Sequence, residues 1–187
     1  MNRIQLEHII RAASHISGDA EIVVIGSQAI HAQDMKLPAI VFQSAEADVY
    51  PRNHPERADD IDAAIGELST FHGTHGYYAL GVSPETAILP AGWQQRLIPI
   101  SNLNTGGATG LCLDVHDLVL SKYAAWREQD IEFNQALVWQ ALVWQGCVSK
   151  RKLARLARRM PINSQMKSII LARIASAFAG TNPSGEG

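Results

Sequence analysis

Hydrophobic and polar positions follow two different periods along the chain, and each period predicts one kind of element. Apolar residues in residues 3–16 recur every three or four positions, which predicts an amphipathic helix. Residues 22–25 are Ile-Val-Val-Ile, a short run of β-branched residues that is typical of a buried strand. A short alternating stretch predicts a strand at residues 46–50, and further strands are expected at residues 77–82, 96–100 and 111–113.

Helical patterns dominate the second half of the chain. They predict helices at residues 115–126, 130–144, 150–160 and 162–179, besides shorter ones at residues 28–33 and 60–68. Strands that alternate with helices are typical of an α/β (α+β) fold. We expect a core in residues 1–130, a helical appendage in residues 131–180 and a flexible tail in residues 181–187.

The composition is that of a folded globular protein. The chain has 187 residues, of which 47% are hydrophobic and 18% are charged, so it is long and apolar enough to bury a core. Its two cysteines, Cys112 and Cys147, lie in no Cys-x-x-Cys or Cys/His cluster, which argues against a disulfide framework or a structural zinc site. The polar start and the lack of an apolar run of about 18 residues predict a cytoplasmic protein without a membrane partner.

Charge is divided unevenly between the two ends of the chain. Residues 1–147 contain eight Lys and Arg and 17 Asp and Glu, whereas residues 148–187 contain eight Lys and Arg and one acid, Glu186. Six of those basic residues surround an apolar stripe in residues 150–160. This helix either binds a phosphate backbone, such as that of RNA, or is a solvated face that contacts acidic residues of the same or a neighbouring chain.

The residues most indicative of chemistry follow the first strand. Gly26 and Ser27 lie between that strand and a predicted helix, where free N–H groups favour a phosphate and glycine allows close approach. Glu46 and Asp48 are two positions apart on the next strand, so both point to one face. Two carboxylates and the phosphates of a nucleotide are typical of a Mg²⁺ site that supports in-line nucleotidyl transfer.

This order of residues resembles the signature of the nucleotidyltransferase superfamily, in which a hydrophobic residue, Gly, and Gly or Ser precede Asp-x-Asp on the next strand. Residues 114–130, DVHDLVLSKYAAWREQD, are similar to a segment of uncharacterised bacterial nucleotidyltransferases related to the AbiEii type. The matching positions there are Asp117, Lys122, Arg127 and Asp130. The resemblance covers about residues 4–135. It implies a minimal nucleotidyltransferase-like mixed sheet flanked by helices, with a helical C-terminal part.

The resemblance also implies a set of site residues and partners. The expected catalytic residues are Glu46, Asp48 and Asp114, with Glu46 and Asp48 as ligands of Mg²⁺. The expected nucleotide-binding residues are Gly26, Ser27, Lys122 and Asp130. The implied activity transfers a nucleotidyl group from an NTP to an unknown acceptor, RNA or protein, in a system related to toxin–antitoxin pairs. A homo-oligomer is compatible with this expectation.

Departures from the signature leave an alternative open. Eighteen residues separate Ser27 from Glu46, more than the family usually has, and the first carboxylate is Glu rather than Asp. Residues 96–100 contain no third carboxylate, and Asp114, the nearest candidate, is equally suited to cap the following helix. Glu46 and Asp48 would otherwise be solvated residues of an edge strand. The alternative function is a catalytically degenerate nucleotidyltransferase fold that acts as a protein- or RNA-binding module.

Other candidate residues also have a purely structural explanation. Lys122 either contacts a triphosphate or extends along the surface of its helix. Arg127 and Asp130 are three positions apart, as in an exposed helical ion pair. His72 and His75 have a spacing compatible with a metal ion, but no third ligand is near in the sequence, so we expect them to be loop histidines.

Overall fold

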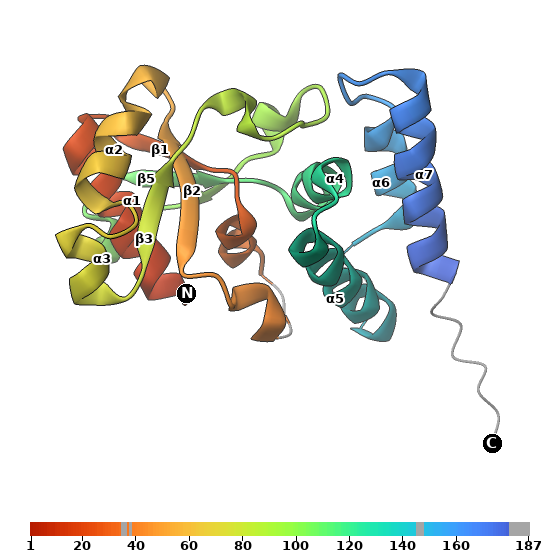
Figure 1. The fold of residues 1–187 in the computed structure, drawn as a ribbon, viewed down its shortest axis with the longest axis horizontal. Coiled ribbons are helices and arrows are strands. Elements are labelled where there is room, and N and C mark those ends of the chain that lie inside the picture. The colour runs from red at the N-terminus through yellow and green to blue at the C-terminus, as the bar shows by residue number, and fades with distance from the viewer. Residues whose placement is uncertain (35–36, 38, 145–147, 180–187) are drawn as a thin grey trace. The chain divides into compact units, whose positions relative to one another are not determined.

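The computed structural model describes residues 1–34, 37, 39–144 and 148–179, which form two compact units (Figure 1). The first unit combines Met1–Asp34, Phe42–Ala87 and Gln94–Asp114, and the second combines Met35–Val41, Ile88–Trp93 and Val115–Gly187. The boundary expected at residue 130 stays a prediction. Cys147 and the tail expected at residues 181–187 lie outside the described residues.

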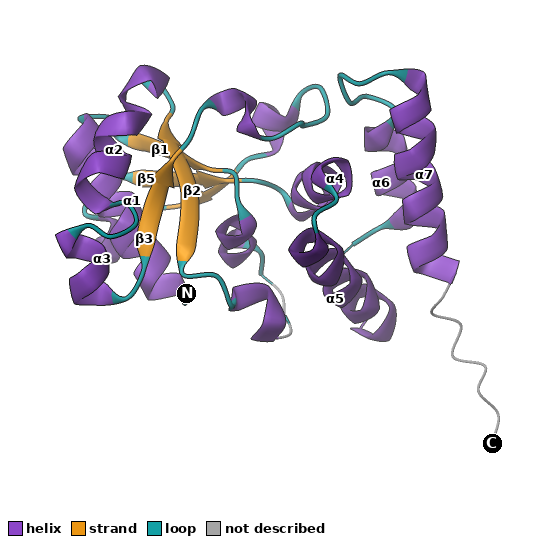
Figure 2. Cartoon of the chain, viewed as in Figure 1, coloured by secondary structure: helices purple, strands orange, loops and turns teal. Residues whose placement is uncertain are grey.

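A five-stranded sheet is the scaffold of the first unit (Figure 2). Its strands are β1 (Glu21–Val24), β2 (Glu46–Pro51), β3 (Tyr78–Gly81), β4 (Ile98–Ile100) and β5 (Thr109–Cys112). Their order in the sheet is β3-β2-β1-β5-β4. The pairs β1–β2 and β4–β5 are antiparallel, whereas β1–β5 and β2–β3 are parallel. This mixed sheet, flanked by helices, confirms the predicted α+β class.

Among the described residues, the first unit contains three α-helices besides short 3₁₀-helices: α1 (Arg3–Ser17), α2 (Ala58–Ile65) and α3 (Thr70–His75). α1 begins with a capping box between Asn2 and Gln5 and ends at Gly18, whose φ of 70° suits glycine. One face of α1 packs on the sheet. Its apolar side chains are fully buried: Leu6, Ile9, Ile10 and Ala13. The 3.6-residue period of the sequence therefore identified the packed face of this helix.

Two short helices differ from the sequence-based expectations. The sequence predicted that His72 and His75 lie in a loop. This prediction is wrong, because both residues lie in α3. Ser69 caps the start of α3 by accepting a hydrogen bond from the backbone N–H of His72. Gly73 lies inside this six-residue helix and obscured its signal, since glycine weakens helices. The helix expected at residues 28–33 is a 3₁₀-helix, η1 (Ser27–Ala32), which begins one residue earlier.

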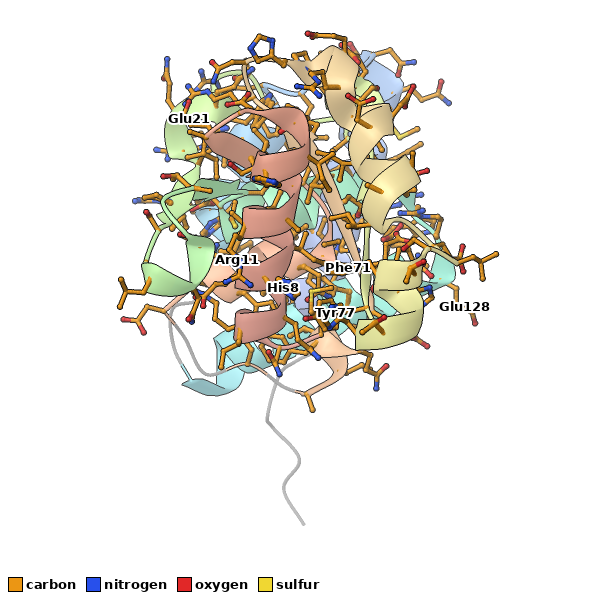
Figure 3. The ribbon with its side chains drawn as sticks, turned by 90° about the vertical axis from the view of Figure 1, so that its left-hand side faces the viewer. His8, Arg11, Glu21, Phe71, Tyr77 and Glu128 are labelled. Carbon is orange, nitrogen blue, oxygen red and sulfur yellow. The ribbon has the colours of Figure 1, made fainter. Side chains whose placement is uncertain are left out.

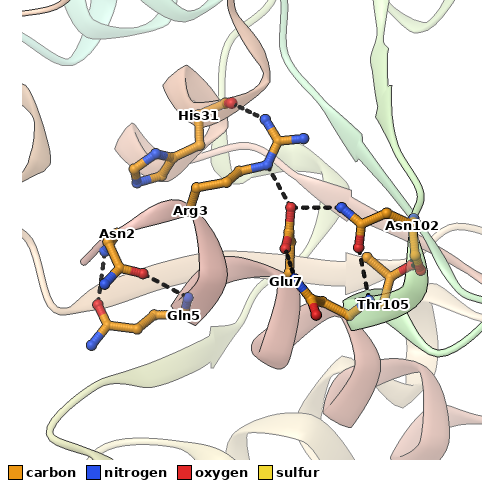
Figure 4. Close-up of polar contacts among 8 residues, drawn as sticks. Asn2, Arg3, Gln5, Glu7, His31, Asn102 and Thr105 are labelled. Atoms are coloured by element: carbon orange, nitrogen blue, oxygen red, sulfur yellow. Dashed lines mark hydrogen bonds and ion pairs between the residues drawn. The ribbon is translucent and has the colours of Figure 1, made fainter.

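A buried carboxylate joins α1 to the segment between β4 and β5. Glu7 is only 3% exposed and accepts a hydrogen bond of 2.8 Å from Asn102 Nδ2 (Figure 4). It accepts a second one, also of 2.8 Å, from Asn104 Nδ2. Arg3 Nε forms an ion pair of 2.8 Å with Glu7, and the Arg3 guanidinium also donates to the carbonyl of His31. Burial alone would raise the pKa of Glu7, but these three donors hold it below its usual value.

In the described part of the second unit, most residues belong to four α-helices: α4 (Val115–Ala125), α5 (Glu128–Trp144), α6 (Lys150–Ala157) and α7 (Ser164–Ala179). They pack around a core that includes the buried side chains of Leu120, Leu137, Leu153, Leu156, Ile170 and Ile174. Arg173 Nη1 donates to the carbonyl of Tyr123 over 2.6 Å, and the Arg173 guanidinium lies 3.6 Å from the centre of the Trp126 ring. No helix in the described part of the chain is long and apolar enough to cross a membrane.

We expect Glu7→Gln to lower the free energy of unfolding by about 1–3 kcal/mol at pH 7, because a buried amide cannot accept from three donors as the carboxylate does. The pKa of Glu7 is lowered in the folded protein. The stabilisation of the folded protein by the Glu7 carboxylate is therefore fully present above the unfolded-state pKa. It is lost as the pH falls through the folded-state pKa. Urea unfolding should show that the difference between wild type and variant shrinks in acid.

Glu21→Gln is the matched control, since Glu21 forms an exposed ion pair of 3.2 Å with Arg52. This substitution should change the free energy of unfolding by less than about 1 kcal/mol. Equal losses in the two variants, or a Glu7→Gln loss that does not depend on pH, contradict the role assigned to Glu7.

Candidate functional site

Glu46 and Asp48 lie on one face of an interior strand. Both are partly exposed, whereas Ala47 and Val49 have no exposed surface. β2 pairs with β1 on one side and with β3 on the other, so the interpretation of these acids as residues of an edge strand is wrong. The strand holds the two carboxylates at positions i and i+2, and a shift of its register would disrupt two ladders.

The acidic face of β2 is the face that α2 does not cover. Val49 pairs with Gly81 in the parallel ladder between β2 and β3, so the two residues share a face of the sheet. A Cβ atom on Gly81 would lie 2.0 Å from the carbonyl oxygen of Ala58, the first residue of α2. Val49 therefore faces α2. Glu46 and Asp48 alternate with Val49 along the strand and face the opposite side.

Gly26 lies directly against the carboxylate of Asp48. A Cβ atom on Gly26 would lie 1.7 Å from Oδ2 and 2.7 Å from Cγ of Asp48, so any side chain there would displace the carboxylate. Gly26 has φ −85° and ψ −169°, angles that any residue adopts, so glycine is required here for space rather than for its conformation. The structure thus brings together the glycine and the second carboxylate of the signature.

The turn after β1 is anchored to the segment that precedes β2. The side chain of Gln28, in η1, is fully buried and donates from Nε2 to the carbonyl of Ser44 over 3.1 Å. The backbone N–H of Ile25 donates to the carbonyl of Asp48 over 3.1 Å. These bonds hold Ser27, the first residue of η1, in a fixed relation to the two acids of β2.

Tyr78 is a residue of this site that the sequence did not reveal. Its hydroxyl donates to Glu46 Oε2 over 2.9 Å, and the two residues are direct partners in the ladder between β2 and β3. Burial, this hydrogen bond and the carboxylates of Glu46, Glu67 and Asp48 raise the pKa of Tyr78 to about 12. The phenol therefore stays protonated and orients the Glu46 carboxylate. The contact of Tyr78 with Glu46 depends on the register between β2 and β3, which a single sequence does not reveal.

The third carboxylate of the signature has no counterpart on β3 or β4. The residues of β3 that pair with Glu46 and Asp48 are Tyr78 and Leu80, and β4 contains no acid. Asp114 lies between β5 and the first residue of α4. Within residues 1–34, 37, 39–144 and 148–179, no group of three or more His, Cys, Asp or Glu side chains is placed to hold a metal ion. Glu46 and Asp48 remain the candidate pair of ligands.

Lys122 and Asp130 lie in the second unit and pair with each other. Lys122 Nζ is 2.8 Å from Asp130 Oδ1, and Arg127 Nε is 2.9 Å from Asp130 Oδ2. The expected pair of Arg127 with Asp130 therefore forms, but the expectation that it is exposed is wrong for Asp130, which is fully buried. Burial alone would raise the pKa of Asp130, but the hydrogen bonds from Arg127 and Lys122 keep it below its usual value. The other predicted site residues belong to the first unit: Gly26, Ser27, Glu46, Asp48 and Asp114.

The two histidines of α3 have different neighbours and take part in packing. The rings of His75 and His8 are 4.9 Å apart between their centres, and His8 Nδ1 shares a hydrogen bond of 2.8 Å with the hydroxyl of Tyr77 (Figure 3). The ring of His72 instead lies 4.6 Å from that of Tyr78. These separate contacts favour a structural role for both histidines over a shared metal ion.

We expect Gly26→Ala to lower the free energy of unfolding by about 1–3 kcal/mol, because its methyl group overlaps the Asp48 carboxylate. Asp48→Ala removes that carboxylate, so the cost of Gly26→Ala should be clearly smaller in this background. Urea unfolding of the four proteins of this double-mutant cycle measures the difference. A cost that is the same with and without the carboxylate contradicts the assigned contact.

Comparison with known proteins connects this geometry to one family. Residues 4–147 match the family described as a nucleotidyltransferase of unknown function (DUF6036). The matched region includes the Gly26 turn, the two acids of β2 and the pair of Lys122 with Asp130. No curated protein matches the chain, and no solved structure does. Since the match extends over most of its length, the chain belongs to the DUF6036 family of nucleotidyltransferases of unknown function.

Proposed function

We propose that this protein transfers a nucleotidyl group from an NTP to an acceptor, with Mg²⁺ held by Glu46 and Asp48. The family match supports the nucleotidyltransferase fold. The observation that carries the proposal is the contact of Gly26 with the carboxylate of Asp48. It joins the glycine after β1 to the acid of β2, the two residues that the superfamily signature places on successive segments.

The donors on β2 fit a magnesium ion. Protein sites for Mg²⁺ commonly use one or two carboxylates and leave the other positions to water and to substrate phosphates. Glu46 and Asp48 provide such a pair of hard oxygen ligands on a partly exposed face. When bound, the ion would neutralise the charge that develops on the transferred phosphate and its leaving group.

Residues of the first unit would keep these ligands and the phosphates in place. Tyr78 donates to Oε2 of Glu46, which leaves Oε1 as the oxygen for a ligand. Gly26 admits the Asp48 carboxylate close to the backbone at the start of η1. The backbone of Gly26 and Ser27 would contact the triphosphate, since no side chain at Gly26 obstructs the approach.

The resemblance adds three residues to the proposal. Lys122 and Asp130 would contribute to nucleotide binding, and Asp114 would serve as the third carboxylate. The ammonium group of Lys122 pairs with the Asp130 carboxylate in this structure. A phosphate that binds Lys122 would therefore exchange for that carboxylate as the partner of the ammonium group. Arg127 would continue to pair with Asp130 after such an exchange, which keeps the buried carboxylate compensated.

The proposed acceptor is RNA or a protein, and the setting proposed from the AbiEii resemblance is a toxin–antitoxin system. Such a toxin would stop the growth of the cell that expresses it by modifying an essential acceptor. We place the reaction in the cytoplasm, where NTPs are supplied.

A second function is favoured by one observation. Among the residues that the structure describes, Glu46 and Asp48 are not joined by a third ligand in a group that could hold a metal ion. A nucleotidyltransferase fold with an incomplete set of acids would persist as a protein- or RNA-binding module. Such a module would bind its partner without Mg²⁺.

Calorimetric titration with each NTP, with and without Mg²⁺, tests the proposed function. Wild type should bind an NTP only when Mg²⁺ is present. Asp48→Asn should weaken this binding at least about tenfold, because an amide carries no negative charge to hold the ion. Its unfolding midpoint should stay close to that of wild type. Nucleotidyl transfer, and the growth arrest expected of a toxin, should be lost with the binding.

Asp59→Asn is the matched control, since Asp59 lies on the exposed side of α2. This variant should bind like wild type. Mg²⁺-dependent NTP binding that survives Asp48→Asn would place the metal site elsewhere. If wild type binds no NTP but binds RNA or protein without Mg²⁺, the second function is favoured.

Tyr78→Phe tests how the Glu46 carboxylate is positioned. The change removes the hydrogen bond of 2.9 Å and keeps the ring, so Mg²⁺-dependent NTP affinity should fall about two- to tenfold with little loss of stability. Tyr77→Phe is the control, because the Tyr77 hydroxyl contacts His8 rather than an acid of β2. Titration calorimetry on both variants decides: equal affinities of Tyr78→Phe and Tyr77→Phe would contradict a specific role for Tyr78.

A further inference from the structure

A dense group of basic side chains lies on α6 and on the turn that follows it. Residues 148–179 contain eight Lys and Arg and no Asp or Glu. Five of these basic residues are exposed: Lys150, Arg151, Arg155, Arg158 and Arg159. We call these five residues the basic face. None of them belongs to the proposed NTP site, so binding of the NTP does not explain the basic face.

Arg151 and Arg155, at the centre of the basic face, lie on the side of α6 opposite its apolar side. With about 100° per residue, Arg151 and Arg155 are about 40° apart around the helix axis, whereas Leu153 and Leu156 are on the other side. Leu153, Leu156 and Met160 are at most 2% exposed. α6 packs on α4 and α7 within the second unit (Figure 1). The helix therefore buries its apolar side and presents its charged side to solvent.

The basic face lacks the acidic neighbours that arginines elsewhere in the chain have. Four arginines each form an ion pair of 2.8–3.2 Å with a carboxylate: Arg3, Arg52, Arg57 and Arg127. In the part of the chain that the structure describes, no carboxylate pairs with a residue of the basic face. Neutralisation of this face by acids of the same chain, an alternative suggested by the sequence, therefore gains no support.

Membranes, acidic proteins and nucleic acids all attract basic helices, and the burial of α6 separates these partners. An amphipathic helix inserts its apolar side into a bilayer, but Leu153 and Leu156 are buried in the second unit. Protein interfaces are built around an apolar centre, whereas the basic face presents charged groups. Closely spaced guanidinium groups match a row of phosphates, because each can donate two parallel hydrogen bonds to phosphate oxygens.

We propose that the basic face binds the phosphate backbone of a nucleic acid strand without sequence preference. The eight residues of α6 extend about 12 Å, which corresponds to the rise of three to four nucleotides of one strand at about 3.4 Å each. Four of the five cations are arginines, each of which can donate two parallel hydrogen bonds to a phosphate. The proposal does not depend on nucleotidyl transfer, since it involves neither Glu46 nor Asp48.

Fluorescence anisotropy of the full chain with labelled 20-nucleotide RNA and DNA, each single-stranded and duplex, tests this proposal. The variant R151Q/R155Q removes two charges that form no ion pair with any described residue, and Gln is as good a helix former as Arg. Its affinity should fall several-fold at low salt. The slope of log K against log salt concentration should become shallower by about 1.4–1.8, since each phosphate contact contributes about 0.7–0.9. The RNA and DNA arms identify which strand is bound.

R11Q/R52Q is the matched control, because it removes the same charge from two exposed arginines of the first unit. This variant should keep the wild-type affinity and slope, and circular dichroism should show that both variants melt like wild type. Three results would overturn the proposal. The first is that wild type binds none of the strands at about 50 mM salt, and the second is that both double variants lose affinity equally. The third is that polyglutamate displaces the strands as well as unlabelled RNA does, which would identify an acidic protein as the partner.

Discussion

The contact between Gly26 and the Asp48 carboxylate constrains the polar face of the first unit. β2 has a neighbouring strand on both sides, so its side chains must alternate between the face covered by α2 and the opposite face. Ala47 and Val49 fill the covered face and are fully buried. Glu46 and Asp48 are therefore confined to the same side, and the chain that leaves β1 passes so close to Asp48 that a side chain at position 26 would displace its carboxylate.

Features that depend on neighbours along the chain were predictable from the sequence, and features that depend on distant residues were not. The β-branched run of β1 and the shared face of Glu46 and Asp48 are local patterns, and the structure confirms both. Tyr78 is 32 positions from Glu46, and their contact follows from a parallel register that no local pattern specifies. The burial of Asp130 likewise depends on the packing of two helices, whereas its charge suggested exposure.

Charge is used in two different ways in this chain. Buried carboxylates such as Glu7 and Asp130 are each surrounded by donors, because an uncompensated buried charge costs several kcal/mol. The cations of the basic face remain hydrated and need no partner to be stable. The charge asymmetry of the sequence therefore has separate causes: part of the acidic excess is structural, whereas the basic excess lies on a surface where it contributes little to folding.

A site with two carboxylates couples its metal to its substrate. In the proposed transferase, Glu46 and Asp48 alone would bind Mg²⁺ weakly, and the NTP phosphates would complete the shell of ligands. The ion and the nucleotide would then each raise the affinity of the other by the same factor, as linkage requires. Tyr78 would support this coupling by orienting Glu46 before either arrives, which reduces the ordering cost of binding. The two candidate functions therefore differ in this coupling rather than in the fold, because a binding module would retain the same strands and acids without any link between Mg²⁺ and its partner.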